Sequence, residues 1–437
     1  MIVAKFGGSS LSEGQQFKKI RDIIQDDPRR RYIVVSAPGK RFPADEKVTD
    51  LLLACYKNAA LNLPFDVEYG KIVSRFQEIS EELDIKGCLD RELAAVREKI
   101  CARSSRAYVA SRGEYLCGLL LSAWLSLPFI DAAGVIRFST DGKLDSETTL
   151  KLLHDALLQH ERAILPGFYG ADSRGNIHVF SRGGSDITGA LAASAADADL
   201  YENWTDVCGF RSADPRIVPD ASYISALTYR ELRELSYMGA TVMHEDAIFP
   251  VRQAGIPTSI RNTNDPLHPG TTIQYSTRHM TKVPTVTGIA GKRGFSVVIL
   301  EKNQMNNEVG FGRKVLAVFE RHQLNFEHLP TGIDTMCVMV PTGALRGKAA
   351  QVTLEIEEAV HPDTITVQGG IALLACVGAG IFRQHGTTAR LFTALAEQGI
   401  SIRTMFQAPS ELSIIIGISE NRLDDAVRAV YDAFIRN

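Results

Sequence analysis

The chain has 437 residues, of which 45% are hydrophobic and 23% are charged, and its formal net charge is −3 at pH 7. This length predicts roughly two to four domains, and the composition is typical of globular proteins. The net charge argues against nucleic acid as the main partner, because binding to a phosphate backbone requires a concentrated basic face. The one basic run, Arg29-Arg30-Arg31, is expected to be a solvated surface segment.

Seven cysteines are spread along the chain, without a C-x-x-C pair or a Cys/His cluster of zinc-binding spacing. We therefore expect reduced thiols, a cytoplasmic protein and no metal site built from protein ligands. The N-terminus enters a strand pattern at Ile2–Phe6 without signal-peptide features, and no apolar run is long enough to span a membrane. No membrane partner is expected.

From the N-terminus to about Pro284, β-rich runs alternate with helical patterns. Strands are expected at residues 2–6, 32–36, 163–166, 177–180 and 203–207, and helices at residues 15–25 and 48–60, with a charged helical excursion at 61–110. This alternation predicts an α/β domain of three layers, αβα, with a mainly parallel sheet covered on both faces. Ligands bind such sheets beyond the carboxyl ends of the strands. Lys5, Ser36, Arg182 and Thr205-Asp206 lie at or beyond these ends, so we expect them to share one crevice.

An internal repeat with an offset of 76 residues follows the turn-rich segment 262–270. Gly310 aligns with Gly386, Leu324 with Ile400, and Val338-Met339-Val340 with Ile414-Ile415-Ile416. Each copy reads as strand, glycine turn, helix, two strands and a further helix, which is the ferredoxin-like βαββαβ order. We expect a catalytic domain at residues 1–284 and two small modules at 285–365 and 366–437, between which strands can be exchanged. Simple duplication of a scaffold is the alternative to a regulatory role.

Two glycine turns carry the chemistry of anion binding. Lys5-Phe6-Gly7-Gly8-Ser9 follows the first strand, and Arg182-Gly183-Gly184-Ser185-Asp186 opens an Ala-rich helix. Backbone N–H groups at such turns bind phosphate or carboxylate, and Lys and Arg add positive charge. Walker, dinucleotide-binding and protein-kinase signatures are absent from the sequence. Each turn taken alone is equally explained as an ordinary connection between a strand and a helix.

Three weaker signals accompany the turns. Val34-Val35-Ser36 ends a strand, Arg112-Gly113-Glu114 begins an apolar helix, and Thr205-Asp206 leads into a loop that contains Arg211 and Arg216. A helix-dipole contact for Glu114 and a polar surface loop at 209–216 are the alternatives to a binding role.

Together these residues resemble the aspartate kinases of the amino-acid-kinase family. The matching segments are Lys5–Leu11, Val34–Ala37, Lys47–Leu51, Gly113-Glu114, Ser181–Asp186, Trp204–Val207, Asp214-Pro215-Arg216 and Met238–His244. The resemblance implies the amino-acid-kinase fold followed by two ACT modules. It also implies transfer of a phosphoryl group from ATP, with Mg²⁺, to the side chain of L-aspartate, giving 4-phospho-L-aspartate. This reaction is the first step of lysine, threonine and methionine biosynthesis.

The resemblance also assigns roles to individual residues. Lys5 and Asp186 would be catalytic, with Lys5 on the transferring phosphoryl group. The substrate would be bound by Ser36, Thr49, Glu114, Arg182, Gly183, Gly184 and Ser185, with Arg182 on its α-carboxylate and Glu114 on its α-ammonium group. The nucleotide would be bound by Lys5, Gly7, Gly8, Ser9, Thr205, Asp206, Arg211, Arg216, Thr241 and Val242. Many relatives have Tyr in place of Arg211 and Lys in place of Thr241, so Arg211 is expected to supply the missing cation.

For the C-terminal modules, the resemblance implies feedback inhibition by lysine, threonine or both, and a homodimer or larger assembly paired through these modules. The expected effector residues are Met305, Glu308, Gly310, Phe311 and His328. Glu308 would accept the ammonium group, and the N–H groups at Gly310-Phe311 would bind the carboxylate. The remaining alternatives are a kinase for glutamate or N-acetylglutamate and a non-catalytic amino-acid sensor on the same scaffold.

Overall fold

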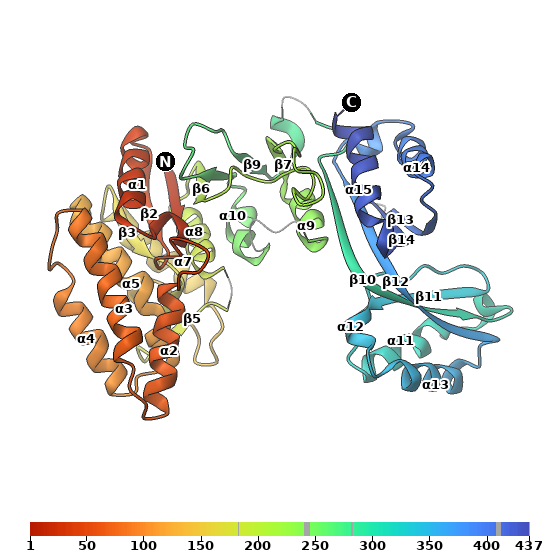
Figure 1. Cartoon of the computed structure of the whole chain (residues 1–437), viewed down its shortest axis with the longest axis horizontal. Coiled ribbons are helices and arrows are strands. Elements are labelled where there is room, and N and C mark those ends of the chain that lie inside the picture. Colours follow the sequence, from red (N-terminus) through yellow and green to blue (C-terminus); the bar gives the residue numbers. More distant parts are fainter. Residues whose placement is uncertain (182, 240–244, 281–282, 408–411, 437) are drawn as a thin grey trace. The chain divides into compact units, whose positions relative to one another are not determined.

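The computed structural model describes residues 1–181, 183–239, 245–280, 283–407 and 412–436. The chain forms two compact units, shown in Figure 1. The first consists of Met1–Phe210, Tyr223–Tyr229 and Val242–His279, and the second of Arg211–Ser222, Arg230–Thr241 and Met280–Asn437. Two short segments that precede residue 284 therefore belong to the second unit, and the predicted domain limits at 284 and 365 remain sequence predictions.

A seven-stranded sheet forms the centre of the first unit, with the strand order β3-β2-β1-β6-β8-β9-β7. All neighbouring strands run parallel except β8 and β9, which are antiparallel. The strands are β1 (Ile2–Phe6), β2 (Arg30–Val35), β3 (Ala163–Pro166), β6 (Leu200–Thr205), β7 (Ala226–Thr228), β8 (Thr258–Asn262) and β9 (Thr271–Gln274). The predicted mainly parallel sheet is thus confirmed.

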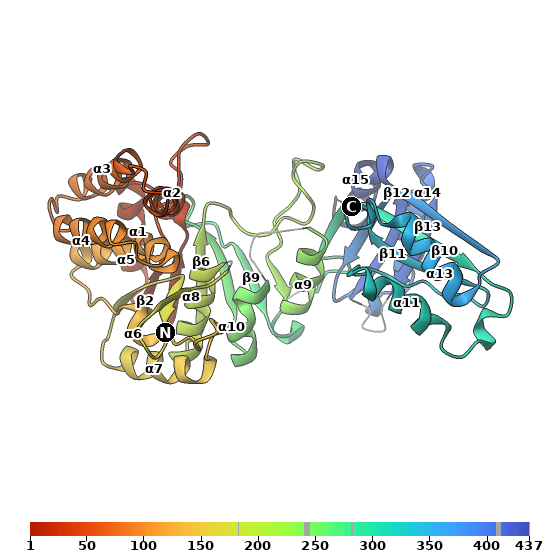
Figure 2. The ribbon, with the colours of Figure 1, turned by 90° about the horizontal axis from the view of Figure 1, so that it is seen from below.

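Helices cover both faces of this sheet, as the two views in Figures 1 and 2 show. They are α1 (Gly14–Asp26), α2 (Val48–Ala60), α3 (Asp66–Glu82), α4 (Asp90–Cys101), α5 (Arg106–Leu125), α6 (Ala132–Val135), α7 (Ser146–Leu158), α8 (Gly184–Ala195) and α10 (Phe249–Ala254), while α9 (Tyr229–Tyr237) passes into the second unit. Ala4 and Phe6 pack in one apolar core with residues from α1 to α5. Side chains alternate along a strand, so Lys5 points to the opposite face, where it meets α8.

The strand expected at residues 177–180 is present, but it does not belong to the main sheet. Residues 177–179 do form a strand, β5, but it pairs only with β4 (Tyr169–Ala171) in a separate two-stranded hairpin. The turn before α8 therefore does not follow a strand of the main sheet. Gly167, directly after β3, instead reaches the first turn of α8, since a Cβ on Gly167 would lie 2.7 Å from the Cα of Ser185. The start of α8 thus still lies at the carboxyl end of the parallel strands.

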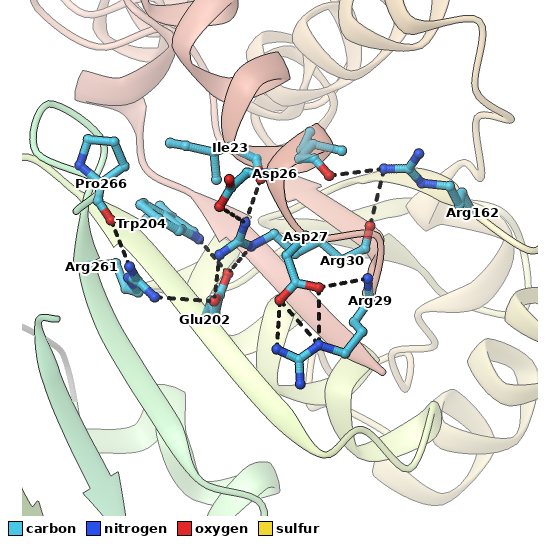
Figure 3. Close-up of polar contacts among 11 residues, drawn as sticks. Ile23, Asp26, Asp27, Arg29, Arg30, Arg162, Glu202, Trp204, Arg261 and Pro266 are labelled. Atoms are coloured by element: carbon cyan, nitrogen blue, oxygen red, sulfur yellow. Dashed lines mark hydrogen bonds and ion pairs between the residues drawn. The ribbon is translucent and has the colours of Figure 1, made fainter. Parts of the chain in front are cut away.

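The basic run at residues 29–31 was also misread. Arg30 is only 4% exposed and its Nε donates to Glu202, which is 1% exposed, at 2.7 Å (Figure 3). The same carboxylate accepts a hydrogen bond from the indole of Trp204 at 2.8 Å, and Arg261 lies 3.8 Å away. Arg29, by contrast, is exposed and pairs with Asp27. A run of basic residues in a sequence cannot show that the side chain of its middle residue, Arg30, is buried.

The second unit is built on a five-stranded antiparallel sheet with the order β11-β10-β12-β14-β13. Its elements are β10 (Gly288–Glu301), α11 (Phe311–Arg321), β11 (Thr335–Pro341), α12 (Thr342–Leu345), α13 (Ala349–Val360), β12 (Thr364–Val377), α14 (Thr387–Glu397), β13 (Ile402–Gln407), β14 (Ser413–Ser419) and α15 (Leu423–Tyr431). The long strands β10 and β12 pair along their whole length, and their helices pack in two separate apolar cores.

The repeat recurs in the structure at the same spacing. Helices α11 and α14 begin and end 76 residues apart, as do the single 3-10 turns Met305–Asn307 and Ile381–Arg383. Gly310 and Gly386 cap the two helices with φ angles of +83° and +82°, a region that favours glycine. The copies differ in one strand: β13 has no full counterpart in the first copy, where His328 and Thr331 make only isolated bridges to β11.

Two further expectations bear on the chain as a whole. Among the described residues, none of the helices is both long and apolar enough to cross a membrane. All seven cysteines, each of which lies in the described ranges, are free thiols.

Candidate active site

The centre of the candidate site is a buried cation. Lys5 is 7% exposed, and its Nζ lies 2.5 Å from the Oδ1 atom of Asp186 in the first turn of α8. The same Nζ donates to Oδ1 of Asn203 at 3.3 Å, and the Nδ2 of Asn203 donates to Asp186 at 2.9 Å. The three side chains form a closed triangle. The predicted catalytic residues Lys5 and Asp186 are therefore brought together by the fold.

The first glycine turn lies directly beyond Lys5. The N–H of Gly7 donates to the carbonyl of Trp204 at 2.9 Å, and the N–H of Gly39 donates to the carbonyl of Gly8 at 2.8 Å. A Cβ on Gly8 would lie 2.8 Å from the carbonyl oxygen of Ala37, so only glycine fits this approach. The turn is thus held between the ends of β2 and β6, and Ser9 continues it into a short 3-10 helix.

The second glycine turn forms the start of α8. Gly183 has a φ of +58° and caps the helix, which begins at Gly184 with Ser185 and Asp186 in its first turn. N–H groups at a helix start have no partner within the helix and create a positive end for an anion. Arg182, the expected carboxylate ligand, lies outside the described residues.

Glu114, in α5, is a buried acid beside the backbone of Ala37, just beyond the end of β2. It is 5% exposed, and its Oε2 atom has no hydrogen-bond partner. Burial raises the pKa of Glu114 to about 8, although the backbone N–H of Ala37 and the charge of Arg112 oppose this shift. The guanidinium of Arg112 instead stacks over the rings of Tyr108 and Tyr115, at 4.5 and 4.4 Å. The free oxygen of Glu114 is thus an unmet acceptor for a cationic group.

The remaining substrate-side predictions lie nearby along the chain. Ser36 is half-buried, and its N–H donates to the carbonyl of Phe6 at 3.2 Å. Thr49 is half-buried in the first turn of α2. The loop that joins them is held by Arg75 from α3, which donates to the carbonyl of Gly39 at 2.9 Å and to Asp45 at 2.6 Å. The charged loop at 39–47 is therefore pinned by ion pairs.

The predicted nucleotide residues are divided between the units. In the first unit, Thr205 is half-buried and donates to Asp206 at 3.0 Å, and Asp206 is exposed. Arg211 and Arg216 belong to the second unit, where Arg211 donates to the carbonyl of Ala221 and Arg216 pairs with Asp214. Thr241 and Val242 lie outside the described residues. The structure thus places Thr205 and Asp206 at the end of β6, next to Asn203 and Trp204.

The expected effector residues are less open than the sequence indicates. Met305 and Phe311 are buried in the apolar core of the first repeat copy, and the N–H of Phe311 already donates to the carbonyl of Glu308. Glu308 is paired with Lys302 at 2.5 Å and Lys314 at 2.7 Å, and hydrogen bonds from these two lysines lower its pKa to about 2. The expectation of a free N–H at Phe311 and a free carboxylate at Glu308 was therefore wrong. His328 is half-buried against Phe406, and burial lowers its pKa.

Sequence reasoning missed Asn203 and Arg75. Asn203 stands opposite Lys5 in the β1–β6 register. A signal for it exists: strands buried on both faces are mostly apolar, yet β6 contains the adjacent polar pair Glu202-Asn203. Arg75 gives no such signal, because it lies in a charged helix whose packing depends on tertiary structure.

The arrangement suits the stabilisation of a highly charged anion. It combines a buried lysine, a glycine turn and a helix start, and its acids are Asp186, already paired, and Glu114, which burial favours as the neutral form. No group of three or more His, Cys, Asp or Glu side chains that could hold a metal ion occurs in the part of the chain that the structure describes.

Comparisons with known proteins address the family and the fold. Residues 1–262 match the amino acid kinase family, and residues 374–434 match the ACT domain. Aspartokinase 3 of Bacillus subtilis is 37% identical over 99% of this chain and 98% of its own length. A crystal structure of Clostridium acetobutylicum aspartate kinase, an allosteric enzyme, is 44% identical with a TM-score of 0.91, and the match covers 99% of both chains.

Aspartokinase III of Escherichia coli shares the fold at 23% identity. Its complex with aspartate and ADP has a TM-score of 0.73 and covers 99% of both chains, and its complex with lysine and aspartate has a TM-score of 0.74 and covers 100% of this chain and 99% of the other. The matches to the Bacillus and Clostridium proteins extend over almost the entire sequence at well above this identity. The chain therefore belongs to the aspartate kinases of the amino acid kinase family.

Proposed function

We propose that the protein transfers the γ-phosphoryl group of ATP to the side-chain carboxylate of L-aspartate, giving ADP and 4-phospho-L-aspartate. A carboxylate oxygen forms a bond to the γ-phosphorus while the bond from that phosphorus to the β,γ-bridging oxygen breaks, and the electron pair leaves with ADP. The single observation that carries this proposal is the buried Lys5, paired with Asp186, directly before the glycine turn.

The charges in the site fit this reaction. An aspartate side chain is already ionised near neutral pH, so the reaction needs no general base. The main barrier is the repulsion between a carboxylate and a polyphosphate, which positive charge and fixed positions reduce. Lys5 would stabilise the transferring phosphoryl group, and the N–H groups of Gly8 and Ser9 would hold the phosphates, while Gly7, whose N–H donates to the carbonyl of Trp204, shapes the turn. Thr205 and Asp206 would contact the rest of the nucleotide.

Recognition of the amino acid rests on two groups of opposite charge. The unpaired Oε2 of Glu114 would accept the α-ammonium group, and Arg182 would pair with the α-carboxylate. Ser36, Thr49 and the N–H groups at Gly184 and Ser185 would complete the pocket. The E. coli enzyme, which shares this fold, has been solved with aspartate and ADP.

Magnesium fits the site in a limited way. The described residues supply no cage of three carboxylates, and Asp186 is the one acid beside Lys5 in the triangle. Mg²⁺ is commonly held by one or two carboxylates together with nucleotide phosphates. Because Asp186 is already bonded to Lys5 and Asn203, Mg²⁺ would be held here mainly by the nucleotide phosphates, whose charge it would neutralise.

The second unit is proposed to regulate the enzyme as a homodimer or larger assembly. The E. coli enzyme has been solved with lysine, and the Clostridium enzyme is allosteric. We propose that lysine, threonine or both bind near Glu308 and Gly310, where Lys302 and Lys314 supply positive charge for a carboxylate. Inhibition by an end product fits the first step of lysine, threonine and methionine biosynthesis.

An acyl-phosphate assay tests the proposed function. The protein is incubated with ATP, Mg²⁺ and either aspartate, glutamate or N-acetylglutamate, and the product is trapped with hydroxylamine. We expect a signal with aspartate and its loss in Lys5→Ala. A signal with glutamate alone, or with N-acetylglutamate alone, would identify that acid as the substrate in place of aspartate. No signal with any acid, in a protein that still binds lysine or threonine in a thermal-shift assay, would favour a non-catalytic sensor.

A further inference from the structure

Asn203 has an unusual environment for a strand residue. It is 5% exposed and lies in β6, in the middle of the parallel sheet, in register with Lys5 on β1. Burying an amide without partners is costly, so a buried asparagine normally has a hydrogen bond for each polar atom. Here both partners are the charged pair itself: Oδ1 accepts from Lys5 and Nδ2 donates to Asp186.

The two hydrogen bonds act on the ion pair in different ways. The Oδ1 atom of Asn203 accepts from Lys5 and so orients its ammonium group. The Nδ2 atom donates to the Oδ1 atom of Asp186, which Lys5 also contacts. A lysine that stabilises a transferring phosphoryl group must direct some of its hydrogen bonds to phosphate oxygens. Asp186 would then lose part of its compensation, and a partly buried carboxylate without a partner is costly. The Asn203 donor holds Asp186 in place during this exchange.

We propose that Asn203 is a positioning residue that keeps the Lys5–Asp186 pair aligned yet releasable for phosphoryl transfer. The proposal rests on the proposed function, and it assigns to a residue outside the glycine turns a part in the chemical step. Asn203 does not touch the amino acid in this scheme. Its replacement should therefore affect kcat far more than either KM.

The nearby groups that carry charge or a titratable proton are few. Lys5 on β1 and Asp186 on α8 face the amide directly, and the hydroxyl of Tyr201 on β6 donates to the backbone carbonyl of Asp186 at 3.3 Å. Arg182, close in sequence, lies outside the described residues. An aspartate at position 203 would therefore place a second carboxylate next to Asp186, with Lys5 between them.

Two variants separate alignment from simple filling of space. Asn203→Leu keeps the volume and removes both hydrogen bonds, and we expect kcat to fall roughly 10- to 100-fold, the value of a hydrogen bond to a charged group. The KM values for ATP and aspartate should each stay within about threefold of wild type, the pattern of an interaction made in the transition state.

Asn203→Asp keeps the acceptor for Lys5 and removes the donor to Asp186. Two close carboxylates share one proton, which raises the apparent pKa of the pair and restores an O–H donor at lower pH. We expect the kcat of this variant, divided by that of wild type, to rise as the pH falls from 8.5 to 6. The same ratio for Asn203→Leu should stay flat. Equal, flat ratios for both variants, or a wild-type kcat in Asn203→Leu, would overturn the proposal.

Thr258→Val is the matched control. Thr258 is a fully buried strand residue on β8, in register with Tyr201, and its hydroxyl bonds to Tyr229 rather than to the Lys5 cluster. We expect this variant to lose stability with an unchanged kcat. A fall in its kcat like that of Asn203→Leu would mean that general loosening of the sheet explains the effect.

A melting experiment distinguishes failure of this proposal from failure of the proposed function. The shared proton raises the folded-state pKa of the Asn203→Asp pair above its unfolded value, so stability relative to wild type should be lost as the pH rises from 5 to 8. Asn203→Leu should show no such trend. If wild type makes no acyl phosphate, the proposed function fails. The melting comparison still tests whether Asn203 donates a hydrogen bond to Asp186. An absence of any pH trend in Asn203→Asp would overturn that contact.

Discussion

The guanidinium of Arg30, at the start of β2, lies 2.7 Å from the carboxylate of Glu202 in β6, and both side chains are almost completely buried (Figure 3). Glu202 also accepts the indole N–H of Trp204, whose carbonyl holds the N–H of Gly7 in the phosphate turn. The buried pair is thus connected to the candidate site through one residue.

Arg30→Gln should destabilise the protein strongly. Removing one partner leaves the Glu202 carboxylate buried with incomplete compensation, which typically costs about 3–5 kcal/mol. Arg29→Gln is the matched control, because Arg29 is the neighbouring arginine and its ion pair with Asp27 is exposed on the arginine side. Chemical denaturation of the two variants checks the prediction, and equal midpoints would contradict it.

Gly39→Ala should impair nucleotide use. A Cβ at this position would lie 2.7 Å from the carbonyl carbon of Gly8 and 2.9 Å from the N atom of Ser9, so the phosphate turn would have to shift. We expect a higher KM for ATP and a lower kcat. The control is Gly70→Ala in α3, where a Cβ meets nothing within 4 Å. That variant should keep wild-type kinetics, and its free energy of unfolding should rise by about 0.5–1 kcal/mol, because alanine is the better helix former.

Aspartate binding should release a proton from Glu114. Burial raises the pKa of this acid to about 8, so it is largely protonated at pH 7, and an arriving ammonium group favours the carboxylate. Calorimetry at pH 7 in two buffers of different ionisation enthalpy should show up to about one proton released in wild type and none in Glu114→Gln. The variant should bind aspartate roughly 10- to 100-fold more weakly, the value of a hydrogen bond to a charged group.

The same pKa sets the pH dependence of stability. The folded-state pKa of Glu114 is raised above that of an unfolded glutamate, so the folded protein binds the proton more tightly. Stability is therefore lost as the pH rises from about 4.5 through about 8, when the buried acid must ionise. Between pH 6 and 8.5 the melting temperature of wild type should fall more than that of Glu114→Gln. Parallel curves would count against the raised pKa.

The effector proposal is tested by a pair of repeat-related variants. Gly310 and Gly386 cap equivalent helices with φ angles of +83° and +82°, and a Cβ at either position meets nothing within 4 Å. Gly310→Ala and Gly386→Ala should therefore cost a similar strain, about 1–2 kcal/mol each. If the effector binds at the first copy, only Gly310→Ala should weaken inhibition by lysine or threonine. Equal changes in both variants would move the site away from Gly310.

Local sequence patterns were sufficient for much of this protein. The alternation of strands and helices predicted the parallel sheet, and the helix predicted at 48–60 coincides with α2. Lys5, Gly7 and Gly8 could be proposed as site residues because a strand end followed by glycines is a recognisable pattern. The repeat was visible for a similar reason, since the glycines at 310 and 386 answer a backbone requirement that no other residue meets as easily.

Tertiary structure decided which distant residues meet. No local sequence pattern shows that Arg30 is buried against Glu202 or that β5 lies outside the main sheet. Nor does one show that two lysines form ion pairs with Glu308. Asn203 belongs to the Lys5–Asp186 pair only because β6 lies next to β1 in a fixed register. Sequence patterns record the needs of a residue's own backbone and burial, whereas the partners of a buried charge are set by strand order, which depends on the packing of the whole sheet.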